Sequence, residues 1–512
     1  MLKRIKPFIY LLFSSMLLTQ VGCKKGTFDI NDVNPNVPSD VSPKFILSGA
    51  LASTASIMRG GDADFAELYM GYWSVSGDYI PVTSTLTYQT TTSYYSGNWD
   101  GQYQLLKNYR QMEQLASSDP NLVDYVAIGK IMEAFHFERL VDMYNNIPYT
   151  DALQGGTIDY PKYDDAATVY TGVLGTLDTA IQLINSAPAT AESPGSYDIM
   201  FQGDMSAWEA LAYTIKLRTV MNLTQTSGGA AIITSALTGL TSDNFLIAGQ
   251  DAAINPGYSN SSNAQQSPFY QAMGFQTNGS PSGNESYYRA CSYAVNFMKN
   301  TSDTLRLFQI YAPAVATGLV QGRAFGSEAA SGEDNQHISG MGPGLLQTPS
   351  APAVIFPACE SLFLQAEATQ EGYLPGGASA AAALYTQAVE ESFRLLQVGT
   401  PTTYATLADD FVSSSNNPNV NISLSTNALQ TIITQEWVAL NGFDPVQTWD
   451  NWKRLGIPSD LPVSIFAGTT APHVPYRLLY SQTEFQYNSV NVAAENVNGY
   501  PDNINDKIFW MP

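Results

Sequence analysis

The side chains that most often carry catalysis are few in this sequence and are not grouped. The only histidines are His136, His337 and His473, and their spacing does not suit a metal cluster. His136-Phe-Glu138 matches a fragment of a zinc deaminase motif, but the paired cysteines that would complete it are missing. We therefore predict that His136 is a packed or capping residue on a helix, and we expect no metal and no cofactor.

Carboxylates are abundant, and two of them are spaced for one side of a helix. Glu360 and Glu367 lie seven residues apart. Two carboxylates could serve a glycosidase, or they could form structural ion pairs and caps. The sequence holds 45 acidic residues, so pairs of this kind also arise by chance. Both interpretations remain open at this point.

Aromatic residues form the most informative group. They are concentrated between residues 72 and 99, in the order Tyr72, Trp73, Tyr79, Tyr88, Tyr94, Tyr95 and Trp99. A sugar ring offers a face of C–H groups to an aromatic ring, and its hydroxyls need a few placed polar partners, as in other aromatic-lined sites. The alternative is that these rings pack loops onto helices, and packing is the interpretation we favour for Trp99.

Composition narrows the class of ligand. The 512 residues carry a formal net charge of −22, with 13% charged and 12% aromatic residues. Nucleic acid is excluded as a partner because its phosphates would be repelled. Few charges together with many Asn, Ser, Thr and Tyr favour contact with neutral polar matter such as carbohydrate.

The N-terminus is typical of an exported protein. Lys3, Arg4 and Lys6 precede an apolar run over residues 8–18 that is too short to span a membrane. Thr-Gln-Val-Gly-Cys at 19–23 resembles a bacterial lipoprotein signal, although Gln20 stands where Leu is usual. We predict a signal peptide over 1–22, acylation of Cys23 and an extended leader over 23–42, the alternative being an ordinary signal with an incidental cysteine.

Two cysteines remain after Cys23. Cys291 and Cys359 are far apart and match no metal or redox spacing. They could form a disulfide or stay as buried free thiols. Since Cys359 falls on an apolar helical stripe, we favour burial.

Helices are predicted along the chain from near Pro43 onward, because apolar residues recur three and four positions apart. The stripes cover residues 128–144, 170–184, 208–215, 355–366, 384–389 and 429–440. A capping box at Ser206-Ala-Trp-Glu209 should begin the third helix. A further helix should open at Asp444 with Pro445 in its first position and stop at Gly456.

The pattern predicts a mainly α fold of stacked helix pairs like a tetratricopeptide array, without a strict repeat length. We expect a single domain over 43–512. Three stretches near 71–99, 251–290 and 311–352 are rich in Gly, Ser, Asn and aromatics. Such long loops are uncommon unless they are functional or disordered, and their aromatic content argues against disorder.

Several segments in order along the mature chain resemble the SusD/RagB family of nutrient-binding lipoproteins. They include residues 29–35, 99–103, 137–149, 201–218, 360–368, 435–458 and 475–488. The resemblance implies an array of helix pairs with an irregular binding face. It also favours the structural interpretation of Glu360 and Glu367, and thus a protein that is not an enzyme.

The resemblance further implies a site, a location and a partner. Ligand contacts would come from the first aromatic stretch and from a later one that contains Tyr258, Asn260, Phe269, Tyr270, Tyr287 and Tyr288. The protein would be anchored to the outer membrane by its lipid and would face the cell exterior. It would pass an oligosaccharide to a SusC-like TonB-dependent porin. Alternatives are a peptide receptor of the RagB type, a surface enzyme that cleaves glycans, and a purely structural subunit.

Overall fold

The computed structural model describes residues 42–512 apart from 62–63, 81, 329 and 496–502. The predicted signal peptide and Cys23 lie outside the described residues. Residues Pro43–Pro512 form one compact unit.

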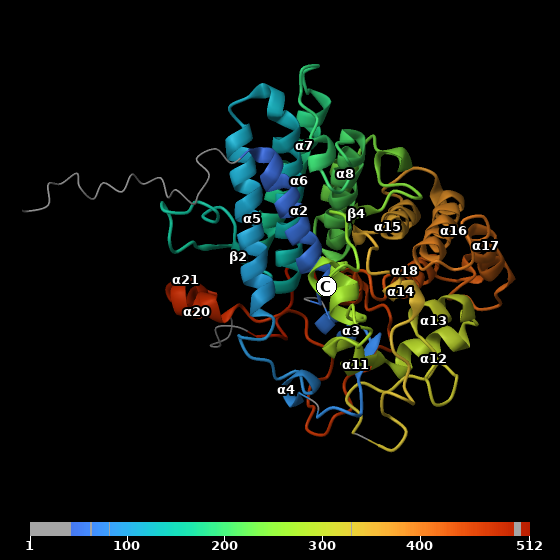
Figure 1. The fold of residues 1–512 in the computed structure, drawn as a ribbon. Helices are drawn as coiled ribbons and strands as arrows, with labels where there is room; N and C mark the ends of the chain where they lie inside the picture. The colour runs from blue at the N-terminus through green and yellow to red at the C-terminus, as the bar shows by residue number, and fades with distance from the viewer. Residues whose placement is uncertain (1–41, 62–63, 81, 329, 496–502) are drawn as a thin grey trace, which may run out of the picture. The chain divides into compact units, whose positions relative to one another are not determined.

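Long helices of the first half pack in chain order (Figure 1). They are α2 (Pro43–Arg59), α5 (Ser96–Ala116), α6 (Val123–Tyr144), α7 (Ala166–Asn185) and α8 (Met205–Met221), followed by the shorter α9 (Gly229–Leu237). Each contacts the next, α2 with α5, α5 with α6, α6 with α7 and α7 with α8. Helix α6 is buried around almost its whole circumference, which places its polar residues in the core.

The second half repeats the arrangement. Its helices are α15 (Ala358–Gln370), α16 (Gly377–Leu395), α17 (Tyr404–Ser414), α18 (Ala428–Ala439) and α19 (Pro445–Leu455). Helix α15 packs on α16 and α18, and it also contacts α8, which joins the two halves around one core. The predicted class, mainly helical with packed helix pairs, is confirmed.

Helix boundaries agree with the sequence at some ends and differ at others. Helix α19 has Asp444 as its N-cap, Pro445 in its first turn and Gly456 at φ +66° after its last residue, as predicted. Helix α8 is capped by Asp204, whose side chain accepts from the N–H groups of Ser206 and Ala207, so the capping box predicted at Ser206 is wrong. The helix begins earlier than predicted, at Met205, and a carboxylate two residues before Ser206 accepts from the free N–H groups of its first turn.

A second boundary correction concerns α15. Ile355 was expected on its apolar stripe, but it lies in strand β6 (Ala353–Phe356), and the helix begins at Ala358 after Pro357. A short buried strand and a buried helical turn are both continuously apolar, so periodicity does not separate them.

The loop-rich stretches contain short elements. Strand β1 (Trp73–Val75) pairs with β5 (Tyr288–Ala290), β2 (Ile147–Pro148) with β3 (Tyr163–Asp164), and β4 (Ala252–Ile254) with β6, all antiparallel. The short helices are α3 (Asp64–Tyr69), α4 (Thr83–Leu86), α10 (Pro268–Met273), α11 (Gly283–Tyr287), α12 (Ser292–Asn300), α13 (Thr304–Ile310), α14 (Pro343–Leu346), α20 (Gln482–Tyr487) and α21 (Ser489–Ala494). These pairings tie the loops to one another and to the helical body.

Candidate functional site

Parts of the three loop-rich stretches meet at one end of the domain, near α4 and α11 (Figure 1). In the β1–β5 pair, Trp73 faces Ala290 and Val75 faces Tyr288. The third stretch is fastened to the first by Arg323, which donates to the carbonyl of Val75 at 2.7 Å and to Glu333 at 2.7 Å. The N–H of Gly77 also donates to the carbonyl of Glu333 at 2.9 Å. Residues far apart in the sequence therefore share one surface.

Two aromatic rings in contact, one exposed and one half-buried, lie on this surface. Tyr79 is 37% exposed, and its ring meets the edge of Tyr287 at 5.3 Å between centroids and 76° between planes. Beside them Asp78 accepts from the N–H of Asn335 at 2.9 Å. We call the surface formed by Asp78, Tyr79, Tyr287, Arg289 and Asn335 the loop face.

Arg289 is a buried cation that follows Tyr288 in strand β5. It is 6% exposed, donates to the carbonyl of Tyr288 at 2.9 Å and forms a long ion pair with Glu285 at 3.6 Å. Burial lowers the pKa of Arg289, and the negative charge of Glu285, with Asp78 and Tyr79 nearby, acts in the opposite direction. Gly340 allows this placement, because a Cβ there would lie 3.0 Å from Nη1 of Arg289.

Three of the predicted ligand contacts, Tyr72, Trp73 and Tyr88, lie in the core. The ring of Tyr72 stacks on Trp437 at 5.0 Å, and Trp73 is 2% exposed and packs on Tyr288. The hydroxyl of Tyr88 accepts from the N–H of Ser464 at 2.9 Å. None of these rings presents a face to solvent, so they carry no part of the proposal below.

Tyr94 and Tyr95 form a second layer beside the start of α5. They are half-buried and meet edge to face at 4.4 Å. The hydroxyl of Tyr95 donates to Asp64, and its ring contacts Phe65 at 5.0 Å. Trp99 is buried among Tyr103, Tyr144 and Tyr480, so its predicted packing role is confirmed.

The predicted ligand contacts between residues 258 and 288 lie in different places in the structure. Tyr287 and Tyr288 belong to α11 and β5 at the loop face. Asn260 is exposed, with its Oδ1 accepting from Gln266 at 2.7 Å, and Tyr258 is half-buried. Tyr270, on α10, lines a separate cavity together with Phe269. Thus the structure brings Tyr79 and Tyr287 together, and it does not gather all nine predicted ligand-binding residues into one site.

Residues of the loop face that were not predicted are Asp78, Arg289 and Asn335. Arg289 follows Tyr287 and Tyr288 directly, and a basic residue inside an aromatic run in a chain with so few charges was a usable signal. Asp78 and Asn335 reach the site only through the folding of two distant loops, and no local pattern marks them.

The candidates for catalysis have structural roles. Glu360 pairs with Arg218 at 3.0 Å and Glu367 pairs with Arg454, all four side chains being almost fully buried. His136 is buried, bonds to Gln102 and Thr54, and its pKa is lowered to about 3, chiefly by burial. Cys291 and Cys359 are buried free thiols, as favoured.

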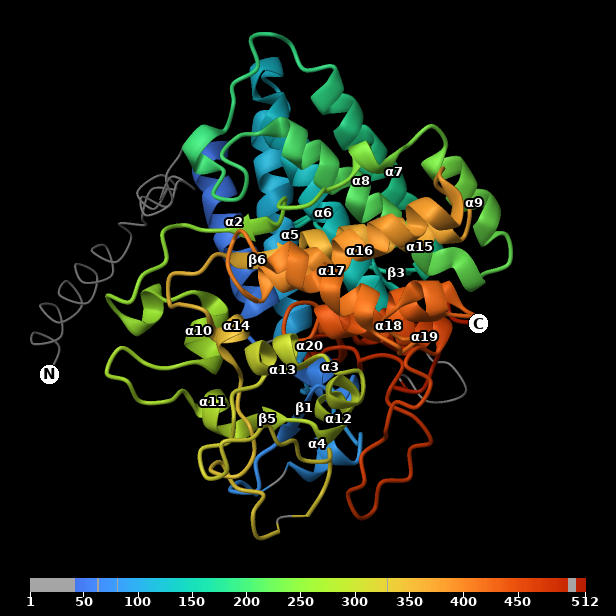
Figure 2. The ribbon, with the colours of Figure 1, turned by 90° about the vertical axis from the view of Figure 1, so that its right-hand side faces the viewer.

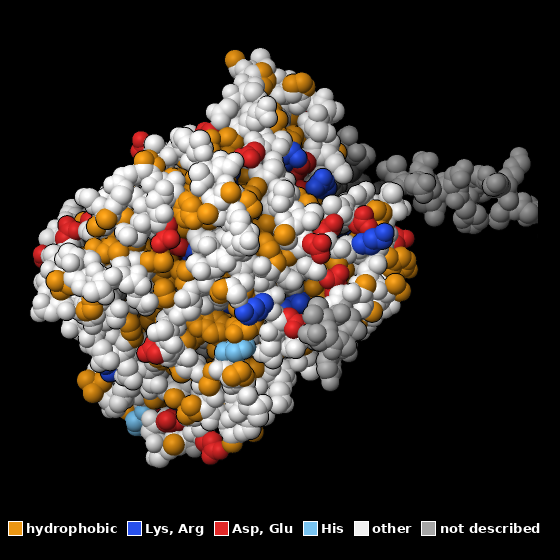
Figure 3. Space-filling model, turned by 180° about the vertical axis from the view of Figure 1, so that it is seen from behind, with side chains coloured by type: hydrophobic (Ala, Val, Ile, Leu, Met, Phe, Trp, Pro, Cys, Tyr) orange, Lys and Arg blue, Asp and Glu red, His pale blue; other side chains and the backbone are white. Residues whose placement is uncertain are grey.

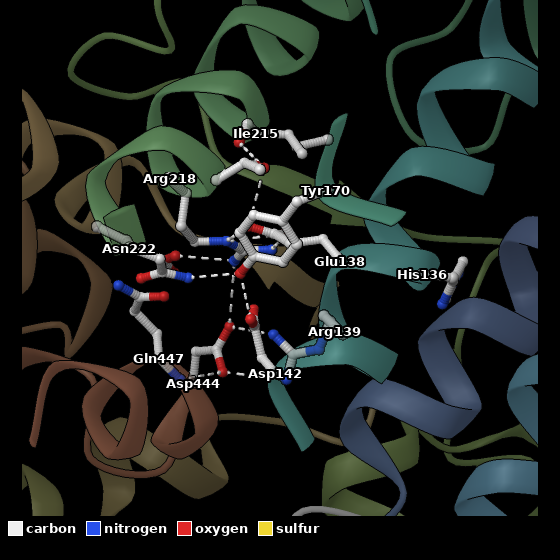
Figure 4. Close-up of polar contacts among 12 residues, drawn as sticks. His136, Glu138, Arg139, Asp142, Tyr170, Ile215, Arg218, Asn222, Asp444 and Gln447 are labelled. Carbon is white, nitrogen blue, oxygen red and sulfur yellow. Dashed lines mark hydrogen bonds and ion pairs between the residues drawn. The ribbon is translucent and has the colours of Figure 1, made fainter. Parts of the chain in front are cut away.

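Figure 4 shows buried ion pairs that join α6, α8 and the N-cap residue of α19. The pair between Arg218 and Glu360 adds α15 to this group. Arg218 donates to Glu138 at 3.0 Å through Nε, and Arg139 donates to Asp444 at 2.7 Å. Tyr170 donates to Asp142 and accepts from Asn222 at 3.0 Å. His136 lies apart from this network in Figure 4. We call the group of Glu138, Arg139, Arg218, Glu360 and Asp444 the ionic core.

The described part of the chain contains no group of three or more His, Cys, Asp or Glu side chains placed to hold a metal ion. Within the same residues, no helix combines the length and apolar character that crossing a membrane would need. The surface seen in Figure 3 is mostly uncharged, with hydrophobic areas and few charged side chains.

The structure thus combines a body of packed helix pairs with a loop surface that presents an aromatic ring. Comparison with known proteins identifies the family of the chain. A family model described as "Starch-binding associating with outer membrane" matches residues 35–481. No curated protein matches the chain. The chain belongs to the SusD-like family, whose members are nutrient-binding outer-membrane proteins and are not enzymes.

Solved structures agree on the fold. A SusD homologue from Bacteroides fragilis NCTC 9343 has a TM-score of 0.73 and 21% identity, covering 92% of this chain and 99% of its own. A SusD/RagB family protein from Bacteroides thetaiotaomicron VPI-5482 has a TM-score of 0.73 and 19% identity, with 92% and 99% covered. A chitin-binding SusD homologue from Flavobacterium johnsoniae has a TM-score of 0.71 and 22% identity, with 91% and 98% covered.

Proposed function

We propose that this protein captures an oligosaccharide at the loop face. The observation that carries the proposal is the exposed ring of Tyr79, which meets the half-buried ring of Tyr287 edge to face. The two rings offer surfaces on which the C–H face of a sugar can pack. Exposed Asp78 and half-buried Asn335 supply polar groups for its hydroxyls, the combination expected of a small-molecule site.

The proteins similar to this chain support a glycan as the ligand class. One similar structure is a chitin-binding protein and another a chitin-binding SusD homologue, and the family description refers to starch. Both polymers are built of uncharged sugar units, and a chain with 13% charged residues suits such ligands. We therefore favour a neutral glycan over a peptide, whose termini and charged side chains would need more ionic partners.

Capture would be the first step of import. We propose that the protein is held at the outer face of the outer membrane by acyl chains on Cys23, and that it passes its ligand to a SusC-like TonB-dependent porin. Membership of the SusD-like family and the lipoprotein-like segment at 19–23 support this arrangement. No bond of the ligand is broken in this role.

The test of capture compares two tyrosines in similar surroundings. Tyr79 and Tyr197 are each 37% exposed, and each meets another ring edge to face, at 5.3 Å and 5.6 Å. Calorimetry on the chain without residues 1–23 would measure binding of chitin and starch oligosaccharides and of peptides. Loss of a stacking ring costs about 1–2 kcal/mol, so Tyr79→Ala should weaken glycan binding about tenfold, whereas Tyr197→Ala should leave it unchanged.

Two results would contradict the proposal. Equal binding by the two variants would mean that the loop face is not the site. Binding of peptides but of no glycan would replace the proposed ligand class with that of a peptide receptor.

A further inference from the structure

A cavity separate from the loop face is lined by residues of α10, α14 and β6. Figure 2 labels these three elements close to one another. The cavity is enclosed by α10, α14, the β4–β6 pair and the ends of α2 and α16, and α10 contacts both α2 and α14. Its volume is about 210 Å³, and one water in the liquid occupies about 30 Å³. The cavity therefore has room for about seven waters, or for one ring-sized molecule.

Arg59 forms the charged part of the cavity wall. This residue is 7% exposed and is the last residue of α2, where the helix dipole favours a cation. Its Nη1 donates to the carbonyl of Phe443 at 2.7 Å. The guanidinium lies 4.6 Å from the centroid of Phe269 and 5.4 Å from that of Phe443, so two aromatic rings fix its position.

The charge of Arg59 is not paired within the part of the chain that the structure describes, where no carboxylate lies within ion-pair distance of it. The nearest acidic influences are Glu67 and Asp444. Asp444 is already bonded to Arg139, and Glu67 accepts from the N–H of Gly442 at 3.0 Å. Burial lowers the pKa of Arg59 to about 10, so these carboxylates do not fully offset the loss of water.

The other charged side chains that line the cavity, Asp251 and Arg394, form ion pairs. Asp251 pairs with Arg394 at 2.6 Å and accepts from the N–H of Ala358 at 2.8 Å. Arg394 also pairs with Glu391 at 2.6 Å. Among the described residues, Arg59 is therefore the charged group of this wall without a counterion within ion-pair distance. A buried cation gains most from a partner that brings a negative charge.

We propose that this cavity is a second ligand site, which binds one small molecule bearing a carboxylate, with the carboxylate on Arg59 and the body of the molecule against Phe269 and Tyr270. A guanidinium presents two N–H groups in the geometry of a carboxylate, which a sugar hydroxyl does not match. Tyr270 is half-buried and Ala351 half-exposed, so the cavity opens to solvent at this edge. A sugar acid and an acylated amino acid share this chemistry.

The experiment uses ligands matched in size. Binding of glucuronate, glucose and N-acetylalanine to the chain without residues 1–23 would be measured by ligand-observed NMR titration. We expect at least one of the two acids to bind at least tenfold more tightly than glucose. Arg59→Lys keeps the charge but loses the paired N–H groups, so it should weaken binding of that acid about tenfold.

A second variant protects the test against a folding defect, because Arg59 also bonds to Phe443. Ala351→Trp places a large ring at the mouth of the cavity and removes no side-chain hydrogen bond. It should abolish acid binding, whereas Ala383→Trp, at an exposed position of α16, should bind as the unchanged protein does. The proposal is overturned if neither acid binds, if glucose binds as tightly as both acids, or if Ala351→Trp retains binding.

Discussion

Arg218 lies within ion-pair distance of three buried carboxylates. Its guanidinium reaches Glu138, Glu360 at 3.0 Å and Asp444 at 3.7 Å, and its side chain is 2% exposed. Lys216, two residues earlier on α8, pairs at 2.6 Å with Asp178, whose side chain is 57% exposed. The two cations thus share a helix but differ in the exposure of their partners.

This contrast gives a prediction for stability. Arg218→Met would leave the carboxylate of Glu138 buried without its counterion, which costs about 3–5 kcal/mol in comparable pairs. Lys216→Met removes a pair with a solvated partner and should cost less than about 1 kcal/mol. Thermal unfolding followed by circular dichroism would compare the two midpoints. Equal midpoints would show that the ionic core does not stabilise the fold.

The exposure of individual aromatic side chains could not be predicted from the sequence. Tyr72, Trp73 and Tyr79 fall within eight positions, yet the first two are at most 2% exposed and the third is 37% exposed. The difference arises because β1 is covered on both faces, whereas Tyr79 follows it in a loop. The sequence identified an aromatic region, but which rings face solvent depends on tertiary packing.

At the scale of elements, the ionic core joins four helices with an unequal number of charges. Two guanidiniums, Arg139 and Arg218, face three carboxylates, Glu138, Glu360 and Asp444. One carboxylate therefore lacks a full partner. Burial raises the pKa of Glu360 to about 8, Asp444 acts in the same direction, and Arg218 opposes it.

The raised pKa of Glu360 predicts a dependence of stability on pH. Between its ordinary value of 4.5 and about 8, the folded state holds a proton that the unfolded chain has released. The free energy of unfolding should therefore fall as pH rises across this window, since stability declines wherever the folded state binds more protons. Glu360→Gln keeps the shape of the protonated acid and should remove this contribution, which is on the order of 2 kcal/mol.

The measurement is the midpoint of thermal unfolding at pH 5 and at pH 8. The difference between the two midpoints should shrink in Glu360→Gln and stay as in the unchanged protein in Glu192→Gln, whose side chain is 47% exposed. An unchanged difference in Glu360→Gln would mean that Glu360 is ionised throughout this range.

Elements were more predictable than their ends. Long amphipathic helices such as α7 and α16 follow from their apolar spacing. The Asp204 cap and strand β6 were missed, because a cap is chosen among neighbouring acceptors and a short apolar strand has no distinctive period. The pairing of β1 with β5 joins positions more than 200 residues apart, which no local pattern indicates.

At the scale of the whole molecule, the segments that identified the family build its scaffold. Residues 137–149 supply Glu138, Arg139 and Asp142, and residues 360–368 supply Glu360 and Glu367. These side chains are buried in or beside the ionic core. The ordered segments therefore predicted the fold and the family, whereas the loop face, which would select the ligand, lies outside all of them.

The whole-molecule prediction concerns Cys23, which lies outside the described residues. If Cys23 carries several acyl chains, each buried CH₂ contributes about 0.8 kcal/mol to membrane binding. Cys23→Ser should then move the protein from the membrane fraction to the soluble fraction of cells that lack the porin.

Mass spectrometry of the N-terminal peptide should find acyl chains only in the unchanged protein. Cys291→Ser, at a buried position, is the matched control and should stay in the membrane fraction. Retention of Cys23→Ser in the membrane without the porin would contradict the lipid anchor, because the mature chain would then need another means of attachment.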